Sequence, residues 1–208
     1  MDILIVIVLL VVNFGISWWN ARVVGQVWAD SKVVGGFPRL VVWSAAIMSA
    51  AGFTWVYLFV LTLPVIAVGG IEPQYARAAI EIGYLMIIVP IIGSGLILTV
   101  HSWMVAARER TVASYGTAAW NTYAQYHNLS DAIRVVPTVS DDLGRIFKSD
   151  AEADSESDSA KKLGVNLICV IVIAALAGGI LTTVAIIRTT AAGVSKEVSE
   201  EVARRQAA

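Results

Sequence analysis

Two titratable residues bracket an apolar stretch, and they are the first candidates for chemistry in this sequence. Glu81 and His101 stand at the ends of a run that contains no charged residue between them. A carboxylate and an imidazole buried in a membrane are typical parts of a proton path. Nineteen residues separate the two, which on a helix is a rise of about 28 Å and puts them on nearly opposite faces. This spacing favours two polar anchors at the two membrane boundaries over a proton relay.

No other residues form the pattern of a catalytic or metal site. The sequence has no phosphate-binding glycine loop and no Ser/His/Asp nucleophile pattern. Cys169, the single cysteine, lies in an apolar run, as an inert packing residue would. The acidic stretch 149–160, SDAEADSESDSA, lacks the glycine turn and ligand spacing of a calcium loop, which predicts a solvated linker. His127 has no second histidine or cysteine near it in the sequence. We therefore expect no metal, no cofactor and no enzymatic activity.

The composition indicates the environment in which the protein folds. Of its 208 residues 57% are hydrophobic and 15% are charged, whereas soluble domains carry about 25% charged residues. Long uncharged runs alternate with polar segments, which predicts an all-α integral membrane protein with the lipid bilayer as its partner. The net charge of −1 gives no basic field for nucleic acid. The first apolar run ends at Trp18-Trp19, which favours a retained anchor over a cleaved signal peptide.

Four stretches are long and apolar enough to span a bilayer: residues 3–19, one helix within 40–71, 82–100 and 163–187. The second run is predicted to be one long tilted helix, kinked or ended at Pro64. Three regions follow from this division: a three-span membrane region (1–107), a helix with an acidic linker (108–162), and the fourth span with its tail (163–208). Residues 194–205 are predicted to form a short C-terminal helix, with Glu200/Arg204 and Glu201/Arg205 as ion pairs.

The basic residues suggest an orientation. Seven of the 15 Lys and Arg residues lie between the third and fourth spans, three lie between the first two, and one, Arg77, lies between the second and third. The positive-inside rule then predicts a cytoplasmic segment 108–162 and both termini outside. Four basic residues in the C-terminal tail disagree with this orientation: Arg188, Lys196, Arg204 and Arg205.

Small residues recur at four-residue spacing in the spans, where they allow helix backbones to approach closely. They are Ala45, Ala46, Ser49 and Ala50 in the second span, Gly93 and Gly95 in the third, and Ala174, Ala175, Gly178 and Gly179 in the fourth. Two interpretations stay open at this point. The small residues pack the four helices of one chain together, or some of them face other subunits.

The region after the third span has a helical pattern of its own, which ends at Pro137. Apolar and aromatic residues recur at three- and four-residue steps, and Trp120 borders them: Val112, Tyr115, Ala119, Tyr123, Tyr126, Leu129 and Ile133. This helix is predicted to continue the third span into the cytoplasm as a long extension. A face rich in tyrosine suits a half-wet contact, and the scarcity of basic residues favours a protein partner over lipid.

Together these features predict a structural membrane protein that self-associates and forms or scaffolds an assembly, as a homo-oligomer or with another membrane protein. The first alternative is a passive channel or pore-forming oligomer lined by weakly polar span residues: Asn13, Ser17, Ser49, Thr54, Thr62, Ser94, Thr99, Asn166, Thr182 and Thr183. A membrane transporter or enzyme ranks third, because no predicted span carries a charged residue at mid-depth.

Overall fold

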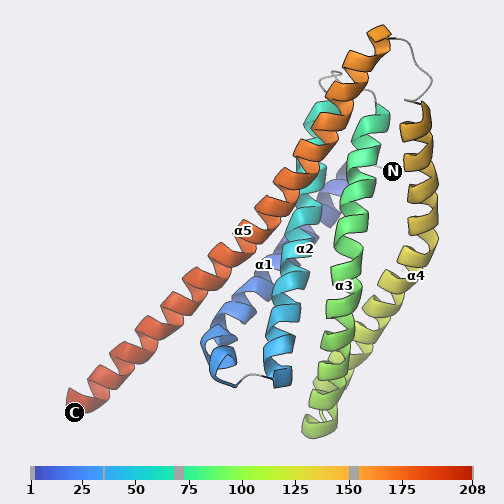
Figure 1. The fold of residues 1–208 in the computed structure, drawn as a ribbon. Coiled ribbons are helices and arrows are strands. Elements are labelled where there is room, and N and C mark those ends of the chain that lie inside the picture. Colours follow the sequence, from blue (N-terminus) through green and yellow to red (C-terminus); the bar gives the residue numbers. More distant parts are fainter. Residues whose placement is uncertain (1–2, 35, 68–72, 150–154, 208) are drawn as a thin grey trace.

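The computed structural model describes residues 3–34, 36–67, 73–149 and 155–207, and every regular element in these ranges is a helix. The five helices are α1 (Ile3–Val34), α2 (Gly36–Ala67), α3 (Pro73–Glu109), α4 (Val112–Ser149) and α5 (Ser155–Ala207) (Figure 1). Four of them are long and apolar enough to cross a membrane, over Leu4–Trp28, Gly36–Ala67, Tyr75–Glu109 and Gly164–Glu201. The predicted all-α fold with four such helices is confirmed; α1, α3 and α5 continue past the C-terminal ends of their predicted spans, and α2 begins before its apolar run and ends at Ala67.

Successive helices alternate in direction along the bundle (Figure 1). Near the end of α1 the Trp28 ring packs edge-to-face on Trp43, near the start of α2, with ring centroids 5.2 Å apart. At the other end Leu58, in the second half of α2, shares a core cluster with Tyr75, near the start of α3. The helices α1 and α3 therefore run one way, and α2 runs the other.

The chain reverses again between α3 and α4. Arg110 adopts a left-handed backbone conformation (φ 52°), and Thr111 caps the next helix by accepting a hydrogen bond from the Ser114 N–H at 3.1 Å. From there α4 returns along α3. The Gln125 amide donates to the Ile92 carbonyl at 2.9 Å, and the Trp103 indole donates to the Thr122 hydroxyl at 3.0 Å.

This reversal corrects the predicted geometry of the third span and its extension. The helix of residues 112–133 exists, but it folds back against α3 instead of continuing it. Pro137 does not end it, because α4 runs on to Ser149. A proline inside a helix removes one backbone hydrogen bond, a loss that the remaining turns tolerate with a bend.

The start of α5 lies beside the start of α3. Gly164 lies against the Tyr75 ring, and Ile168 and Ile171 share a core cluster with Ala78 and Ala79. The helices α3 and α5 therefore run in the same direction, so the connection between them has to cover the length of α3, and α4 does so (Figure 1). The two ends of the described chain consequently lie at opposite ends of the bundle (Figure 1), while the side of a membrane on which each terminus lies stays a prediction.

The C-terminal tail also differs from its prediction. It is the continuous end of α5, which projects away from the other helices (Figure 1), and no separate short helix forms. Arg205 pairs with Glu201 at 2.8 Å as expected, whereas Arg204 approaches Glu201 at 3.6 Å instead of the predicted Glu200. Of the predicted acidic linker, residues 150–154 lie outside the described residues, and residues 155–160 form the first turns of α5.

Candidate functional site

The small residues of α2 and α5 meet one another inside the chain. A methyl group added at Gly179 would lie 2.7 Å from the Ala50 carbonyl oxygen and 2.8 Å from the Thr54 backbone nitrogen, so the two backbones touch there. Gly178 faces the Tyr57 ring, whose hydroxyl is 2.8 Å from the Thr182 hydroxyl. These two glycines therefore sit at a contact within one chain.

The opposite side of α2 packs on α1 through equally small residues. The buried Ser49 hydroxyl donates to the Ser17 carbonyl at 2.6 Å, and the Asn13 amide donates to the Gly52 carbonyl at 3.2 Å. Ala46 belongs to a core cluster with residues of α1 and α5, and Ala45 packs against that cluster. In hydrocarbon such polar groups need a protein partner, and α1 and α2 supply it to each other.

The remaining small residues divide between packed and exposed positions. Ala175 is fully buried in the core, whereas Ala174 is exposed. Gly95 is buried against the Gln125 side chain of α4, whereas a methyl group added at Gly93 would meet nothing within 4 Å. The sequence positions alone do not tell which residue of each pair is packed and which is exposed.

Glu81 and His101 lie far apart along α3. The Glu81 carboxylate pairs with Arg77, one turn earlier, at 2.6 Å. His101 is half-buried near Phe37, at the start of α2, with ring centroids 6.3 Å apart. Since Arg77 and Phe37 belong to opposite ends of the bundle, the two titratable residues do not meet, and their role as anchors at the membrane boundaries stays a prediction. No group of three or more His, Cys, Asp or Glu residues in the described ranges is arranged to hold a metal ion.

The two faces of α4 differ in character. Small and polar residues at three- and four-residue steps pack toward the rest of the chain, among them Ser114, Ala118, Gln125 and Ala132. The predicted contact residues point outward and form the α4 outer face, defined here by Val112, Tyr115, Ala119, Trp120, Tyr123 and Tyr126, all of which are exposed. The helix thus turns its apolar side away from the chain, as a helix does when lipid or another protein covers it.

Three rings of the α4 outer face lie at the depth of the α3 span. Their neighbours Asn121 and Gln125 bond to Thr99 and Ile92, respectively, within the apolar part of α3. Trp120 contacts Tyr123, with ring centroids 5.9 Å apart. Among the residues that the structure describes, the hydroxyls of Tyr123 and Tyr126 and the Trp120 indole N–H have no hydrogen-bond partner. These three polar-tipped rings, at three-residue steps, form a row along α4.

A cavity of about 280 Å³ with a partly polar lining lies between α1, α2, α3 and α4. Its lining includes Asn13 and Asn20 of α1, Tyr84 of α3, and Asn128 and Asp131 of α4. Sequence reasoning missed Asn128 and Asp131 because it sent residues 112–133 away from the bundle. The signal that could have found them is the regular spacing of Asn121, Gln125 and Asn128 on the side of α4 opposite its tyrosines.

No protein-family model, no curated protein and no solved structure matches the chain, so its function has to be argued from these residues and contacts.

Proposed function

We propose that the chain is a structural multi-pass membrane protein without catalytic activity, which builds an assembly by binding other copies of itself through the α4 outer face. The observation that carries the proposal is the row of Trp120, Tyr123 and Tyr126, exposed at the depth of the α3 span with polar tips that have no partner in the described chain. A second subunit provides both the apolar cover and the missing hydrogen-bond groups.

Lipid alone is a poor cover for this face. Acyl chains offer no hydrogen-bond acceptor, and a hydroxyl in hydrocarbon without a partner costs free energy. Tyrosine and tryptophan are also the residues that contribute most to protein interfaces, because they bury a large rigid area and still offer one polar group. By contrast, the exposed large side chains in the first turns of α1 are aliphatic and suit acyl chains: Leu4, Ile5, Ile7, Val8, Leu9, Val11 and Val12.

The membrane topology that supports this assembly has five passes, with α4 crossing beside α3. Nine of the 15 Lys and Arg residues, among them Arg22, Arg39, Arg108 and Arg188, then belong to the end of the bundle with the basic C-terminal tail. Six belong to the other end: Arg77, Arg134, Arg145, Lys148, Lys161 and Lys162. By the positive-inside rule the end with Arg22 faces the cytoplasm and the first residue of α1 faces outside. The tail residues that contradicted a four-pass topology agree with this one.

Cysteine cross-linking in membranes tests the contact. In a Cys169→Ala background, Tyr123→Cys should form disulfide-linked dimers on mild oxidation, because equivalent residues of two copies approach each other across a symmetric interface. Val8→Cys is the matched control, since Val8 is 51% exposed and Tyr123 is 55% exposed. Equal cross-linking of both variants, or a monodisperse monomer in mild detergent, would contradict self-association through α4.

A passive pore is the second candidate, and the carboxylate of Asp131 at the cavity between α1, α2, α3 and α4 favours it. Asp131 lies beside Tyr84 at this cavity, which brings a carboxylate to the depth of the spans, where the four apolar helices alone offer none. A carboxylate in a water-filled passage selects for cations. Asp131→Asn should therefore reduce the cation selectivity of any conductance measured in planar bilayers, and a protein that never conducts would remove this candidate.

A further inference from the structure

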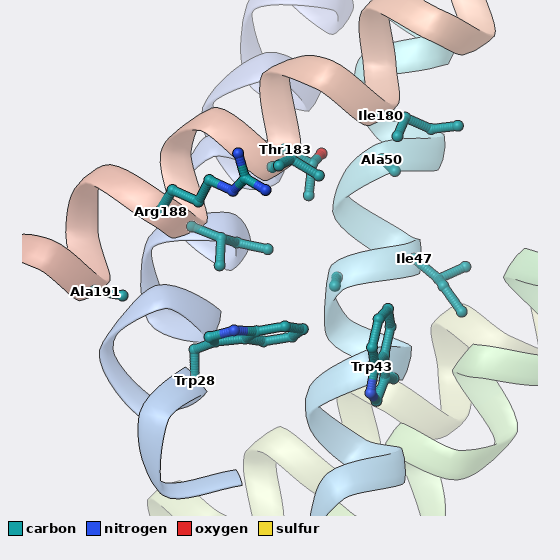
Figure 2. Close-up of a pocket in the computed structure, with 11 residues that line it drawn as sticks. Trp28, Trp43, Ile47, Ala50, Ile180, Thr183, Arg188 and Ala191 are labelled. Carbon is teal, nitrogen blue, oxygen red and sulfur yellow. The ribbon is translucent and has the colours of Figure 1, made fainter. Parts of the chain in front are cut away.

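A second surface of the molecule has the form of a lipid site. A groove of about 600 Å³ opens between the last part of α1, the first part of α2 and the middle of α5. Figure 2 shows Trp28, Trp43, Ile47, Ile180 and Arg188 around it. Its volume falls within the range of about 300–1,000 Å³ that is usual for small-molecule sites. We call it the interfacial groove.

The two ends of the interfacial groove differ in chemistry. Toward the middle of the bundle its lining is aliphatic and includes Ile47 and Ala50 of α2 and Ile180 and Val184 of α5. Toward the end of the bundle lie the edge-to-face indoles of Trp28 and Trp43. Indoles of this kind belong to the headgroup level of a bilayer, because each ring is apolar with one polar N–H.

Among the side chains that the structure describes, Arg188 is the only charged one that lines the interfacial groove. It follows directly on the apolar run of α5, and its exposed guanidinium makes no hydrogen bond or ion pair with the described residues. Arg22, at the same end of the bundle, lies outside this groove and rests on the Trp18 ring, 5.4 Å from its centroid. Arg188 is thus an unpaired cation placed where an aliphatic wall ends.

We propose that the interfacial groove binds one anionic phospholipid. Its acyl chain lies along Ile47, Ala50, Ile180 and Val184, its glycerol region lies beside the two indoles, and its phosphate pairs with Arg188. The guanidinium suits this role, because its planar fork of donors matches a phosphate with two parallel hydrogen bonds. A second protein helix would cover the aliphatic wall but would pair with Arg188 only if it carried an acidic residue at that depth. The inference requires insertion in a membrane and does not depend on self-association.

Tryptophan quenching by brominated lipids tests the site on the full chain. The protein is reconstituted in phosphatidylcholine vesicles that carry a small, equal fraction of brominated phosphatidylglycerol or brominated phosphatidylcholine. The groove signal is the part of the quenching that disappears in a Trp28→Phe, Trp43→Phe double variant. We expect brominated phosphatidylglycerol to quench this signal more strongly, because the anionic lipid is enriched at the site.

Two substitutions decide the result. Arg188→Gln should abolish the preference, so that both lipids quench equally, and Arg22→Gln should leave it intact, since Arg22 has the same charge at the same membrane end. Both side chains are exposed, so neither change threatens the fold. The proposal is overturned if the wild-type protein shows no preference, if Arg188→Gln retains it, or if Arg22→Gln removes it equally.

Discussion

A single methyl group at Gly179 should measure how closely α2 and α5 pack. In Gly179→Ala the new carbon would lie 2.7 Å from the Ala50 carbonyl oxygen and 2.8 Å from the Thr54 nitrogen. Heavy atoms in ordinary contact are about 3.5–4.0 Å apart, so the two helices have to separate by roughly 0.7 Å or more. These two obstacles are backbone atoms, which cannot rotate away as a side chain can, and the Thr54 hydroxyl oxygen is a third obstacle that lies nearer still.

The expected magnitude follows from two opposing terms. Overpacking of a tight contact costs about 1–3 kcal/mol, and backbone obstacles place this site in the upper half of that range. Replacing a helical glycine by alanine contributes about 1 kcal/mol in favour of the helix. The net result should be a loss of about 1–2 kcal/mol in the free energy of unfolding.

Gly93→Ala is the matched control, because the same added methyl group meets nothing within 4 Å. It should leave stability unchanged or raise it by up to about 1 kcal/mol. Gly178→Ala should fall between the two, since its obstacle is the movable Tyr57 ring at 3.0 Å. Reversible unfolding in mixed micelles, followed by circular dichroism, measures all three variants. Equal stability of the Gly179 and Gly93 variants would refute the close packing of α2 on α5.

Two further predictions concern the α1–α2 contact and the number of passes. Ser49→Ala should lower the free energy of unfolding by about 1 kcal/mol, because it removes the buried 2.6 Å hydrogen bond to the Ser17 carbonyl. Ser199→Ala, at an exposed position, is the control. Equal losses of stability in the two variants would contradict the prediction. In a cysteine-free background, Ala107→Cys and Ser199→Cys should both resist an impermeant thiol reagent in intact cells, because five passes put these two positions on the cytoplasmic side. Ala67→Cys, on the other side, should react. If only one of Ala107→Cys and Ser199→Cys reacts, the four-pass topology is correct instead.

The sequence predicted the apolar helices well, because hydropathy over some twenty residues is a property of the chain itself. It did not predict where α4 goes. That depends on the backbone of Arg110, which is left-handed although arginine has no special preference for such a conformation. The helical pattern before and after Arg110 reads as one helix, so a prediction from periodicity had no reason to end α3 there.

The contact residues illustrate a second limit. Gly93 and Gly95 are both small residues of the same span, yet Gly95 lies against Gln125 and Gly93 lies in open space. A small residue permits two helices to approach closely. Which small residue lies at the contact depends on how the helix is rotated about its own axis, and the sequence does not give that rotation. Asp131 was missed for a related reason, since its place beside Tyr84 exists only once α4 has folded back.

The path of α4 has a consequence for how the protein is made. Asn121, Gln125 and Asn128 make this helix too polar to enter a bilayer alone, and Gln125 obtains its partner, the Ile92 carbonyl, from α3. On the five-pass topology proposed above, α4 must enter as the second arm of a hairpin whose first arm is already in place. If α4 failed to insert during synthesis, α5 would cross the membrane in the opposite direction. The Ser199→Cys variant would then react with the impermeant thiol reagent in intact cells, and the reacting fraction would measure how often insertion fails.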